Sequence, residues 1–339
     1  MQHKIVTKQK LLNESGSLLN PGYALKPLFD YSRKDIKASK WRIKEWDYYA
    51  ILNNDFGLSL TIADLGYSFL ISAVFFDFKN AACFKKTKIG WFSFGKMNMP
   101  STSEFGNIAY HDKVFDFDFY RFENHRRLLC QVKNFQTGKE LSADITLRDL
   151  KDDSMIIATP WKENPKAFYY NQKINCLPCS GIIKIGDNEY QFDDETSYGV
   201  LDWGRGVWTY KNTWFWGSAS GNYNGKRFGF NIGYGFGDTS KATENMIFYD
   251  GIAHKLNNIT FIVDQTDYQK PWRFTSDDQR FEMTMVPIID RQDNTNFLII
   301  KNIGHQVFGK FYGFVILDDG TKLEINNLLG FAEQITNHY

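Results

Sequence analysis

Side chains able to move protons surround one unusual segment of the chain, residues 199–237. This segment holds ten of the 26 glycines and four of the nine tryptophans. The acid/base candidates in or beside it are two carboxylates and two histidines: Asp202, Glu244, His254 and His305. A carboxyl group or an imidazole can donate a proton to an alkene, or accept one from water or a hydroxyl group. Each of the four can instead serve the fold alone, as an ion-pair partner or a buried histidine.

The sequence DWGRG (202–206) places a carboxylate and a guanidinium three residues apart. A guanidinium fork matches a carboxylate, and a glycine-flanked turn can bring the two groups together. We therefore expect Asp202 and Arg205 to lie within ion-pair distance. In that arrangement Asp202 either orients Arg205 or acts as an acid/base, or the pair simply braces a turn.

Residues 228–237 alternate between large side chains and positions that are nearly all glycine. The even positions are all large, whereas the odd positions are glycine except for Asn231. A bare strand face lets a ligand or another backbone come close, and glycine also permits the bulges of a sharply bent sheet. The segment is therefore either the floor of a pocket or a corner of a barrel.

Aromatic rings with a few polar groups suit a hydrophobic or a sugar ligand. Trp214 and Trp216 share one strand face with Ser218 and Ser220. A sandwich core with satisfied indole N–H groups shows the same pattern. The candidate ligand-binding residues are Trp203, Arg205, Trp214, Trp216, Asn231, Gly233, Gly235, Asn245 and Gln306.

Several kinds of cofactor and metal chemistry lack their motifs in this sequence. GSASG (217–221) has alanine where a nucleophile elbow needs serine. GYGFG (233–237) lacks the dinucleotide spacing, and no amphipathic helix follows it. The six histidines have no metal spacing, and Cys176 and Cys179 have no second pair to complete a zinc site. We therefore expect no cofactor, no metal and plain thiols at all four cysteines.

Charge and hydropathy limit the partners of the protein. The net charge is +1 and the isoelectric point is about 7.6, whereas nucleic-acid binders usually carry a basic stripe. No stretch of 18 or more apolar residues predicts an integral membrane segment. The basic first ten residues are not followed by the apolar run of a secretory signal. We expect a cytoplasmic protein whose partner is a hydrophobic small molecule, and the oligomeric state stays open.

The composition favours strands. Phenylalanine, tyrosine and tryptophan make up 17% of the residues, and there are only 8 prolines. Residues 114–123 alternate between two faces, and turn residues at 137–138, 186–188 and 318–320 separate strand-like runs. Helical character is limited to a segment at about 32–44 and to the tail FAEQITNH. These patterns predict an all-β protein of antiparallel barrels or sandwiches with little helix.

Two β-domains are expected from the length and the change in composition. The first, 1–180, begins with an irregular arm over residues 1–38, and the second, 181–339, carries the glycine- and tryptophan-rich segment. We also expect the hairpin 305–325 to pack in the same barrel as strand 228–237. Both segments have glycines in one phase and aromatic residues in the other, so their bare faces could line one cavity.

Five stretches of the sequence resemble a single bacterial family. They are KAFYYNQKINCLPCSG, YGVLDWGRGVWTYKNTWFWGSASG, FGFNIGYGFGDTSKATENMIFYDGIAHKL, RFEMTMVPIIDR and GHQVFGKFYGFVILDDG. Together they look like the family of domain of unknown function 2804. The resemblance covers most of the chain, is densest from about 165 to 335, and implies a fold rather than an activity.

A looser similarity concerns the order of three elements. These are Tyr-Tyr at 169–170, an acidic–aromatic–glycine turn at 202–204, and Trp-x-Trp at 214–216. Carotenoid 1,2-hydratases, tocopherol cyclases and related lipocalin-like proteins are similar in this respect. The resemblance implies two calycin-like β-barrels in tandem. By analogy it also implies cofactor-free proton transfer on a lipid or isoprenoid, or lipid binding without catalysis.

Three hypotheses for the function result. The first is a cofactor-independent hydratase, cyclase or isomerase, with Asp202 or Glu244 as acid and His254 or His305 as base. In that enzyme Trp203, Trp214 and Trp216 would stabilise a developing cation. The second is a lipid- or isoprenoid-binding module without turnover, and the third is a carbohydrate-binding protein. A carboxylate in an apolar site without an arginine or lysine partner would favour the enzyme.

Overall fold

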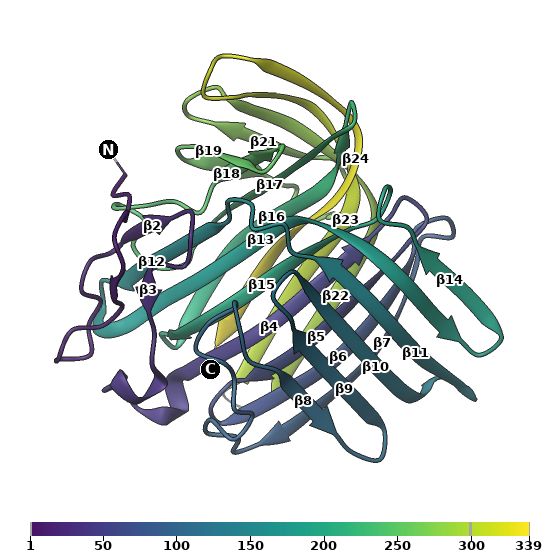
Figure 1. The fold of residues 1–339 in the computed structure, drawn as a ribbon, viewed down its shortest axis with the longest axis horizontal. Helices are drawn as coiled ribbons and strands as arrows, with labels where there is room; N and C mark the ends of the chain where they lie inside the picture. The colour runs from purple at the N-terminus through teal and green to yellow at the C-terminus, as the bar shows by residue number, and fades with distance from the viewer. Residues whose placement is uncertain (1, 298–299, 339) are drawn as a thin grey trace.

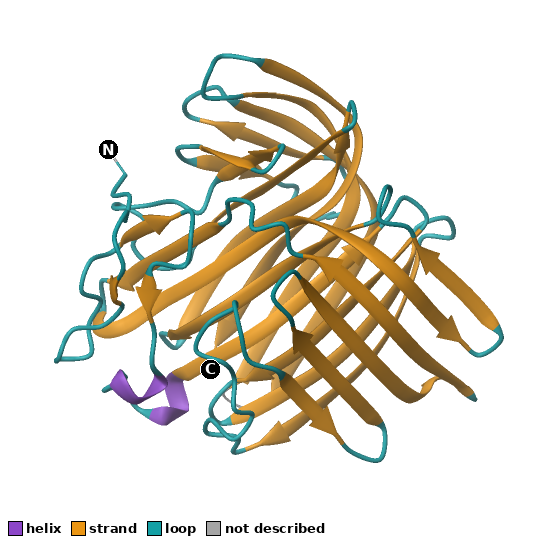
Figure 2. Cartoon of the chain, in the orientation of Figure 1, coloured by secondary structure: helices purple, strands orange, loops and turns teal. Residues whose placement is uncertain are grey.

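The computed structural model describes residues 2–297 and 300–338 (Figure 1). Strands dominate it, and the helices among these residues are two single-turn 3-10 helices, η1 (Arg33–Asp35) and η2 (Lys40–Arg42) (Figure 2). Both lie inside the 32–44 segment to which the sequence assigned helical character. The prediction of an all-β fold with little helix is confirmed.

The N-terminal arm lies against the first sheet. Its strands are β1 (Gln9–Lys10), β2 (Gly22–Ala24) and β3 (Phe29–Asp30). β2 pairs with β12 (Met155–Trp161), and the side chains of Leu11 and Phe29 are buried. Removing these apolar side chains from water holds the arm on the body of the protein.

The first sheet has thirteen strands, all paired antiparallel. Besides β2 and β12 its strands are β4 (Ile43–Leu52), β5 (Phe56–Asp64), β6 (Ser68–Asp77), β7 (Ala82–Trp91), β8 (Ile108–His111), β9 (Phe115–Arg121), β10 (His125–Gln136), β11 (Lys139–Arg148), β13 (Asn164–Ile185), β14 (Asn188–Phe192) and β15 (Tyr198–Val207). The predicted turns at 137–138 and 186–188 join β10 to β11 and β13 to β14. Its middle runs in the order β4-β15-β13-β11, so β15 and β13 are central strands.

The second sheet has nine antiparallel strands in the order β19-β18-β17-β16-β24-β23-β22-β21-β20. They are β16 (Lys211–Tyr223), β17 (Lys226–Tyr234), β18 (Met246–Tyr249), β19 (Ile252–Lys255), β20 (Ile259–Ile262), β21 (Trp272–Ser276), β22 (Phe281–Phe297), β23 (Ile300–Ile316) and β24 (Lys322–His338). Both sheets curl, and the long strands β22–β24 extend from the second sheet across the first (Figure 1). The two-sheet antiparallel architecture expected from the sequence is therefore present.

The sheets divide between Val207 and Lys211, in the link 208–210. The boundary placed at 180 from the sequence falls inside β13, a continuous strand of 22 residues. If each sheet is taken as one unit, the division therefore comes after β15. β13 also contains a bulge between Ile174 and Leu177, where its register shifts against β15.

The tail FAEQITNH is a strand, not a helix. It forms the end of β24, which pairs with β16 on one side and β23 on the other. Pairing on both sides satisfies its backbone groups, and this tertiary context outweighs a short helical pattern. Hairpin 305–325 and strand 228–237, which we expected to pack in the same barrel, belong to one sheet, since β17, β23 and β24 are all strands of the second sheet.

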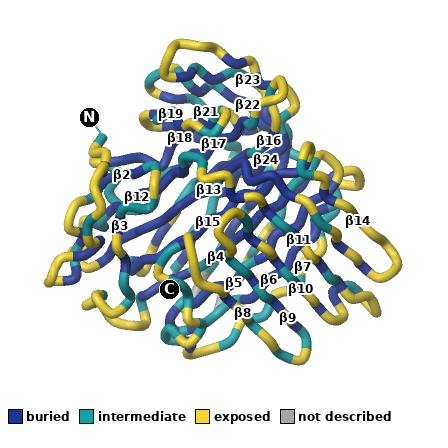
Figure 3. The backbone as a smooth tube through the Cα atoms, viewed as in Figure 1, coloured by how far each residue is buried: buried dark blue, intermediate teal, exposed yellow. Residues whose placement is uncertain are grey.

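Apolar packing joins the two sheets into one body. Phe76 of β6 and Phe308 of β23 have ring centroids 4.1 Å apart. One continuous buried cluster contains residues of both sheets, while a second lies within the second sheet. Figure 3 shows where the buried residues lie along the backbone. Among the described residues, no helix has the length and apolar character needed to cross a membrane.

Candidate active site

Polar side chains of the first sheet form a row that faces the second sheet. Register places Lys173 of β13, Asp202 of β15 and Tyr48 of β4 side by side. Every residue of β15 is buried, because its other face lines the interior of the curled first sheet. The row is therefore held on rigid central strands and closed off from water.

A matching row stands on the second sheet. Trp216 of β16, Glu333 of β24 and Gln306 of β23 are side by side in register. The two rows touch, since Lys173 Nζ lies 3.9 Å from the ring centroid of Trp216, and Gln306 Nε2 donates to the Tyr48 hydroxyl group at 3.3 Å. Polar and charged groups of both sheets thus meet in one buried cluster.

Lys173 and Asp202 form an ion pair at the centre of this cluster. Lys173 Nζ lies 2.8 Å from Asp202 Oδ1, and Asn171 Nδ2 donates to the same oxygen at 2.7 Å. Lys173 is 1% exposed and Asp202 7%. Charges buried this deeply need a partner, because an isolated charge loses its hydration without compensation.

Glu244 joins the cluster from the segment between β17 and β18. Its Oε2 accepts a hydrogen bond from the Tyr169 hydroxyl group at 3.4 Å. Its Oε1 is buried without a hydrogen-bond partner among the described residues, and no basic side chain among them forms an ion pair with it. Burial raises the pKa of Glu244 to about 7, and the nearby Lys173 ammonium partly opposes that rise.

Glu333 is the second carboxyl group with a displaced pKa. Trp214 Nε1 donates to its Oε1 at 2.9 Å, and Gln306 Nε2 donates to its Oε2 at 3.0 Å. Burial raises the pKa of Glu333 to about 7, while the Trp214 hydrogen bond and the Lys173 charge lower it. Arg291 NH1 fixes Gln306 by donating to its Oε1 at 2.7 Å.

Two asparagines hold the segment that carries Glu244. Asn231 accepts from Trp216 Nε1 at 2.7 Å and donates to the backbone oxygen of Glu244 at 2.9 Å. Asn245 accepts from the backbone N–H of Gly233 at 2.7 Å. The candidates Trp216, Asn231 and Asn245 therefore act on the position of Glu244.

The glycines of β17 have two different roles. A Cβ at Gly233 would overlap Glu244 Oε1, so the missing side chain gives that carboxyl group its space. Gly235, just after the strand, has a φ of 98°, a backbone conformation that side chains rarely adopt. Gly233 thus leaves space for the Glu244 carboxyl group, and Gly235 allows the chain to bend just after the strand.

An aromatic cluster links this site to the surface. The Trp208 ring lies 5.3 Å from both Trp161 and Trp214, and 5.9 Å from Tyr169, measured between centroids. Trp161 also lines a surface hollow of about 340 Å³, together with Gly235 and Gly237. Because Tyr169 contacts Glu244 and Trp214 contacts Glu333, these packed rings form an aromatic path of side-chain contacts from the hollow to both carboxyl groups.

The predicted ion pair between Asp202 and Arg205 is wrong. The DWGRG segment is a strand, and residues three apart in a strand point to opposite faces. Arg205 lies on the inner face, where its guanidinium stacks 4.0 Å from the Trp203 ring centroid and lies 3.0 Å from Asp47 Oδ1. Trp203 and Arg205 are therefore separated from the acid–base cluster by their own strand.

Neither candidate histidine belongs to the cluster. His254 of β19 accepts from the backbone N–H of Asp318 at 3.2 Å. His305 of β23 lies 2.8 Å from Asp290 Oδ2 and stacks on Tyr268 with centroids 3.7 Å apart. Since successive side chains of a strand alternate, His305 points away from the face on which Gln306 meets Glu333.

The sequence reasoning missed Lys173 and Glu333, and it named Tyr169 only as part of the Tyr-Tyr element and not as a site residue. Glu333 was hidden because its segment was taken as helical. Lys173 and Tyr169 lie in KAFYYNQKIN, where Tyr169, Asn171 and Lys173 occupy alternate positions. This period-two pattern of polar and aromatic residues in a central strand was the available signal.

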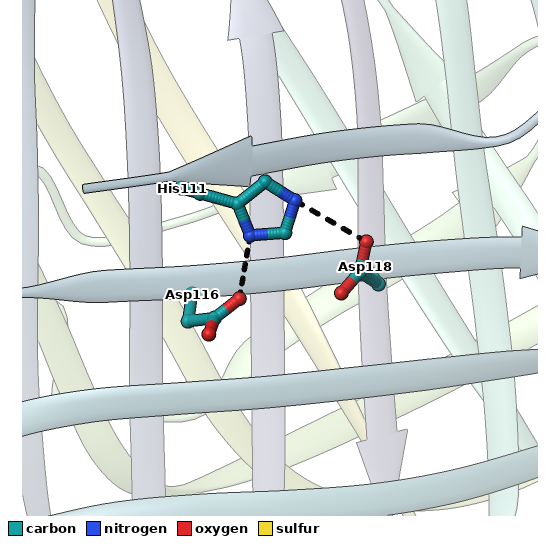
Figure 4. Close-up of side chains that lie close together, drawn as sticks. All are labelled: His111, Asp116 and Asp118. Atoms are coloured by element: carbon teal, nitrogen blue, oxygen red, sulfur yellow. Dashed lines mark hydrogen bonds and ion pairs between the residues drawn. The ribbon is translucent and has the colours of Figure 1, made fainter.

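A separate cluster of His111, Asp116 and Asp118 lies on the outer face of the first sheet (Figure 4). Their ligand atoms lie within 4.8 Å of one another. His111 Nδ1 is 2.6 Å from Asp116 and Nε2 is 3.5 Å from Asp118, so the imidazole itself bridges the two carboxylates. Spacing in the sequence did not show this cluster because its members come from two neighbouring strands, β8 and β9.

The buried cluster has the composition of an acid–base site. Asp202 is paired with Lys173, whereas Glu244 and Glu333 have pKa values near neutrality. A carboxyl group of that kind can both donate and accept protons near pH 7. Two such groups beside aromatic rings can exchange protons with an apolar molecule.

Comparison with solved structures found chains that are similar to this one at low sequence identity. AttH from Nitrosomonas europaea is 12% identical and covers 93% of this chain and 99% of its own, with a TM-score of 0.48. Kievitone hydratase from Nectria haematococca is 8% identical and covers 87% of this chain and 88% of its own, also at 0.48. CghA with Sch210972 is 9% identical and covers 97% and 96%, at 0.42. No curated protein matches the sequence.

The family suggested by the five sequence stretches is confirmed. Its model matches residues 2–339, which is nearly the whole chain. Both sheets, the Lys173–Asp202 pair and the two neutral-range carboxyl groups therefore lie within a single family unit. This chain belongs to the family described as domain of unknown function DUF2804.

Proposed function

We propose that this protein is a cofactor-independent enzyme that transfers protons to and from a hydrophobic small molecule, as a hydratase, cyclase or isomerase of an alkene. The observation that supports this most directly is Glu244. This residue is 1% exposed, one of its carboxyl oxygens has no hydrogen-bond partner among the described residues, and burial raises its pKa to about 7. A perturbed carboxyl group without an ion-pair partner is more typical of catalysis than of structure.

Glu244 is the proton donor in this proposal. Its carboxyl proton passes to one alkene carbon, the π electrons form the new C–H bond, and the neighbouring carbon becomes cationic. The rings of Tyr169 and Phe236, stacked 4.7 Å apart beside Glu244, lie where they can stabilise that charge. Ionised Glu333 then takes a proton from the attacking water or hydroxyl group, or from an adjacent carbon.

The Lys173–Asp202 pair modifies the protonation of both carboxyl groups. Burial is the main cause of their raised pKa values. The Lys173 charge lowers the pKa of Glu244 and of Glu333, and the Asp202 charge raises both. The pair changes the pKa values of the two carboxyl groups and does not itself contact the substrate.

A non-catalytic hydrophobic-binding protein is the second candidate. Both oxygens of Glu333 accept hydrogen bonds from protein groups, as a structural carboxyl group would. In that case the cluster fixes the two sheets together, and the aromatic path alone receives the ligand. The two candidates share a ligand class and differ in whether a proton moves.

Deuterium labelling separates the two. Ligand extracted from freshly purified protein is identified by mass spectrometry and incubated with the protein in D₂O. An enzyme incorporates carbon-bound deuterium, and Glu244→Gln and Glu333→Gln lose this while retaining the ligand. Glu324→Gln, an exposed position on the same strand as Glu333, is the matched control. A retained ligand that gains no deuterium makes the protein a binding module, and unchanged labelling in Glu244→Gln refutes the role of that residue.

A further inference from the structure

We infer that the interior of the first sheet is a second binding site, for a single carboxylate group, and that the loop 92–107 closes over it. This site lies on the opposite face of β15 from the acid–base cluster. It uses Trp203 and Arg205, which the proposed function leaves without a role. The inference does not depend on the proposed function.

Two buried arginines hold the loop by its backbone oxygens. Arg205, which is 0% exposed, donates from Nε and NH2 to the Pro100 oxygen at 3.1 and 2.9 Å. Arg126, which is 3% exposed, donates from NH2 to the Ser103 oxygen at 2.8 Å. A carbonyl oxygen is a weaker partner for a guanidinium than a carboxylate oxygen is. The two loop carbonyls therefore occupy positions that an anionic ligand would fill better.

Two donors of the same interior lack an acceptor. Trp203 Nε1 and Arg126 Nε are buried without a hydrogen-bond partner among the described residues. Trp203 is 1% exposed, and its ring stacks on the Arg205 guanidinium. Buried N–H groups are nearly always paired, so these two point to an oxygen-bearing ligand.

The charge balance favours one negative charge. Three arginines with buried side chains contact two buried aspartates, namely Arg121, Arg126 and Arg205 with Asp149 and Asp47. A third acid, Glu45, lies 3.9 Å from Arg205 Nε but is already paired with Arg33. One guanidinium charge of this interior is thus left over, and a single carboxylate would neutralise it with two oxygens in fork geometry.

The loop is anchored at its start, where Ser93 Oγ and the Gly95 N–H donate to Asp64 at 2.9 and 2.7 Å. The part that the two arginines hold, at the Pro100 and Ser103 oxygens, follows this anchor. Movement of that part, with the start of the loop fixed, would free both guanidinium groups.

The neighbours of the arginines are apolar. Tyr49 accepts from Arg126 NH1 at 3.5 Å, and its ring lies 5.3 Å from Phe119. Leu128, two residues along β10 from Arg126, is fully buried on the same face. The ligand class is therefore a carboxylic acid with an apolar body.

Calorimetric titration of the full chain tests this with three probes. The first probe is dodecanoate below its critical micelle concentration. The second is dodecanol, which has the same alkyl chain without the charge, and the third is inorganic phosphate, an anion without an alkyl chain. We expect dodecanoate to bind at least tenfold more tightly than either. Because the ligand displaces the part of the loop that the arginines hold, dodecanoate should also speed amide hydrogen exchange at 98–106. Equal binding of dodecanoate and dodecanol, tighter phosphate binding, or unchanged loop exchange overturns the inference.

Adjacent arginines of β10 provide the variants. Arg126→Met should weaken dodecanoate binding at least tenfold, whereas Arg127→Met, which removes an exposed arginine paired with Asp144, should stay within twofold. A folded Arg126→Met protein that binds as the wild type does contradicts the site. If that variant does not fold, the three-probe comparison and the loop exchange in the wild-type protein decide the question alone.

Discussion

Lys173 on β13 and Asp202 on β15 are direct cross-strand partners, with Nζ and Oδ1 2.8 Å apart and both side chains buried between the two sheets. Both residues are almost fully removed from water, so each depends on the other for charge compensation. The Lys173 charge also lowers the pKa values of both Glu244 and Glu333, and the Asp202 charge raises both. A change at this ion pair is therefore expected to affect both the stability of the fold and the pKa values of the two glutamates.

Loss of Lys173 should be strongly destabilising. Lys173→Met leaves Asp202 buried without its cation, which costs on the order of 3–5 kcal/mol. Lys184→Met is the control, since Lys184 lies on the same strand but is exposed in its pair with Glu189. Such surface pairs contribute about 0–1 kcal/mol. Denaturant unfolding measures both, and equal effects would contradict the role of the buried pair.

Glu333 should make stability fall as pH rises. Its pKa is raised from 4.5 to about 7, so between these values the folded protein keeps a proton that the unfolded chain has lost. Its contribution is complete below pH 4.5 and is lost as pH rises through about 7. Relative to wild type, Glu333→Gln should gain stability across this window, on the order of 3 kcal/mol. The exposed Glu324→Gln should show no such trend in the same unfolding series, and a flat difference for Glu333→Gln would refute the assignment.

Period-two patterning was sufficient to predict the class of fold. The alternation at 114–123 became β9 with Phe115, Phe117 and Phe119 buried. The turn residues at 318–320 join β23 to β24 as expected. These signals are local, because one buried face and one turn suffice to produce them.

The partners within the site could not be predicted in the same way. Asp202 and Glu244 were identified, but Asp202 meets Lys173 from a strand 29 positions earlier in the chain, not the nearby Arg205. β15 is buried on both faces, so its sequence lacks the alternation that would have shown it to be a strand. Which residue faces which sheet is fixed only by tertiary pairing.

The contact between Arg205 and Asp47 leads to a separate prediction. Arg205 contacts Asp47 and lies on the opposite strand face from Asp202. A double-mutant cycle of Arg205→Met with Asp47→Asn should show a coupling energy of about 0.5–3 kcal/mol. The cycle of Arg205→Met with Asp202→Asn should be close to additive. A larger coupling with Asp202 than with Asp47 would restore the original ion pair.

The space beside Gly233 is expected to be needed by Glu244. In Gly233→Ala the new Cβ overlaps Glu244 Oε1 and lies 2.6 Å from the backbone oxygen of Phe215, which cannot move aside easily. We expect a loss of about 1–3 kcal/mol in the free energy of unfolding. Deuterium labelling of the bound ligand should also fall, because the carboxyl group must shift. Gly304→Ala is the matched strand control, since its Cβ would meet only Ile335 side-chain carbons at 3.2 Å or more.

The Gly235→Val variant is to be compared with Gly233→Ala. Gly235 has a φ of 98°, so a side chain there strains the backbone whether or not a ligand is present. We expect this variant to unfold at lower denaturant and to do so equally with and without ligand. Gly233→Ala should instead be the variant that folds but loses labelling. If Gly233→Ala labels as the wild type does, the bare face of β17 serves only to bend the sheet, and Glu244 is not held by that glycine.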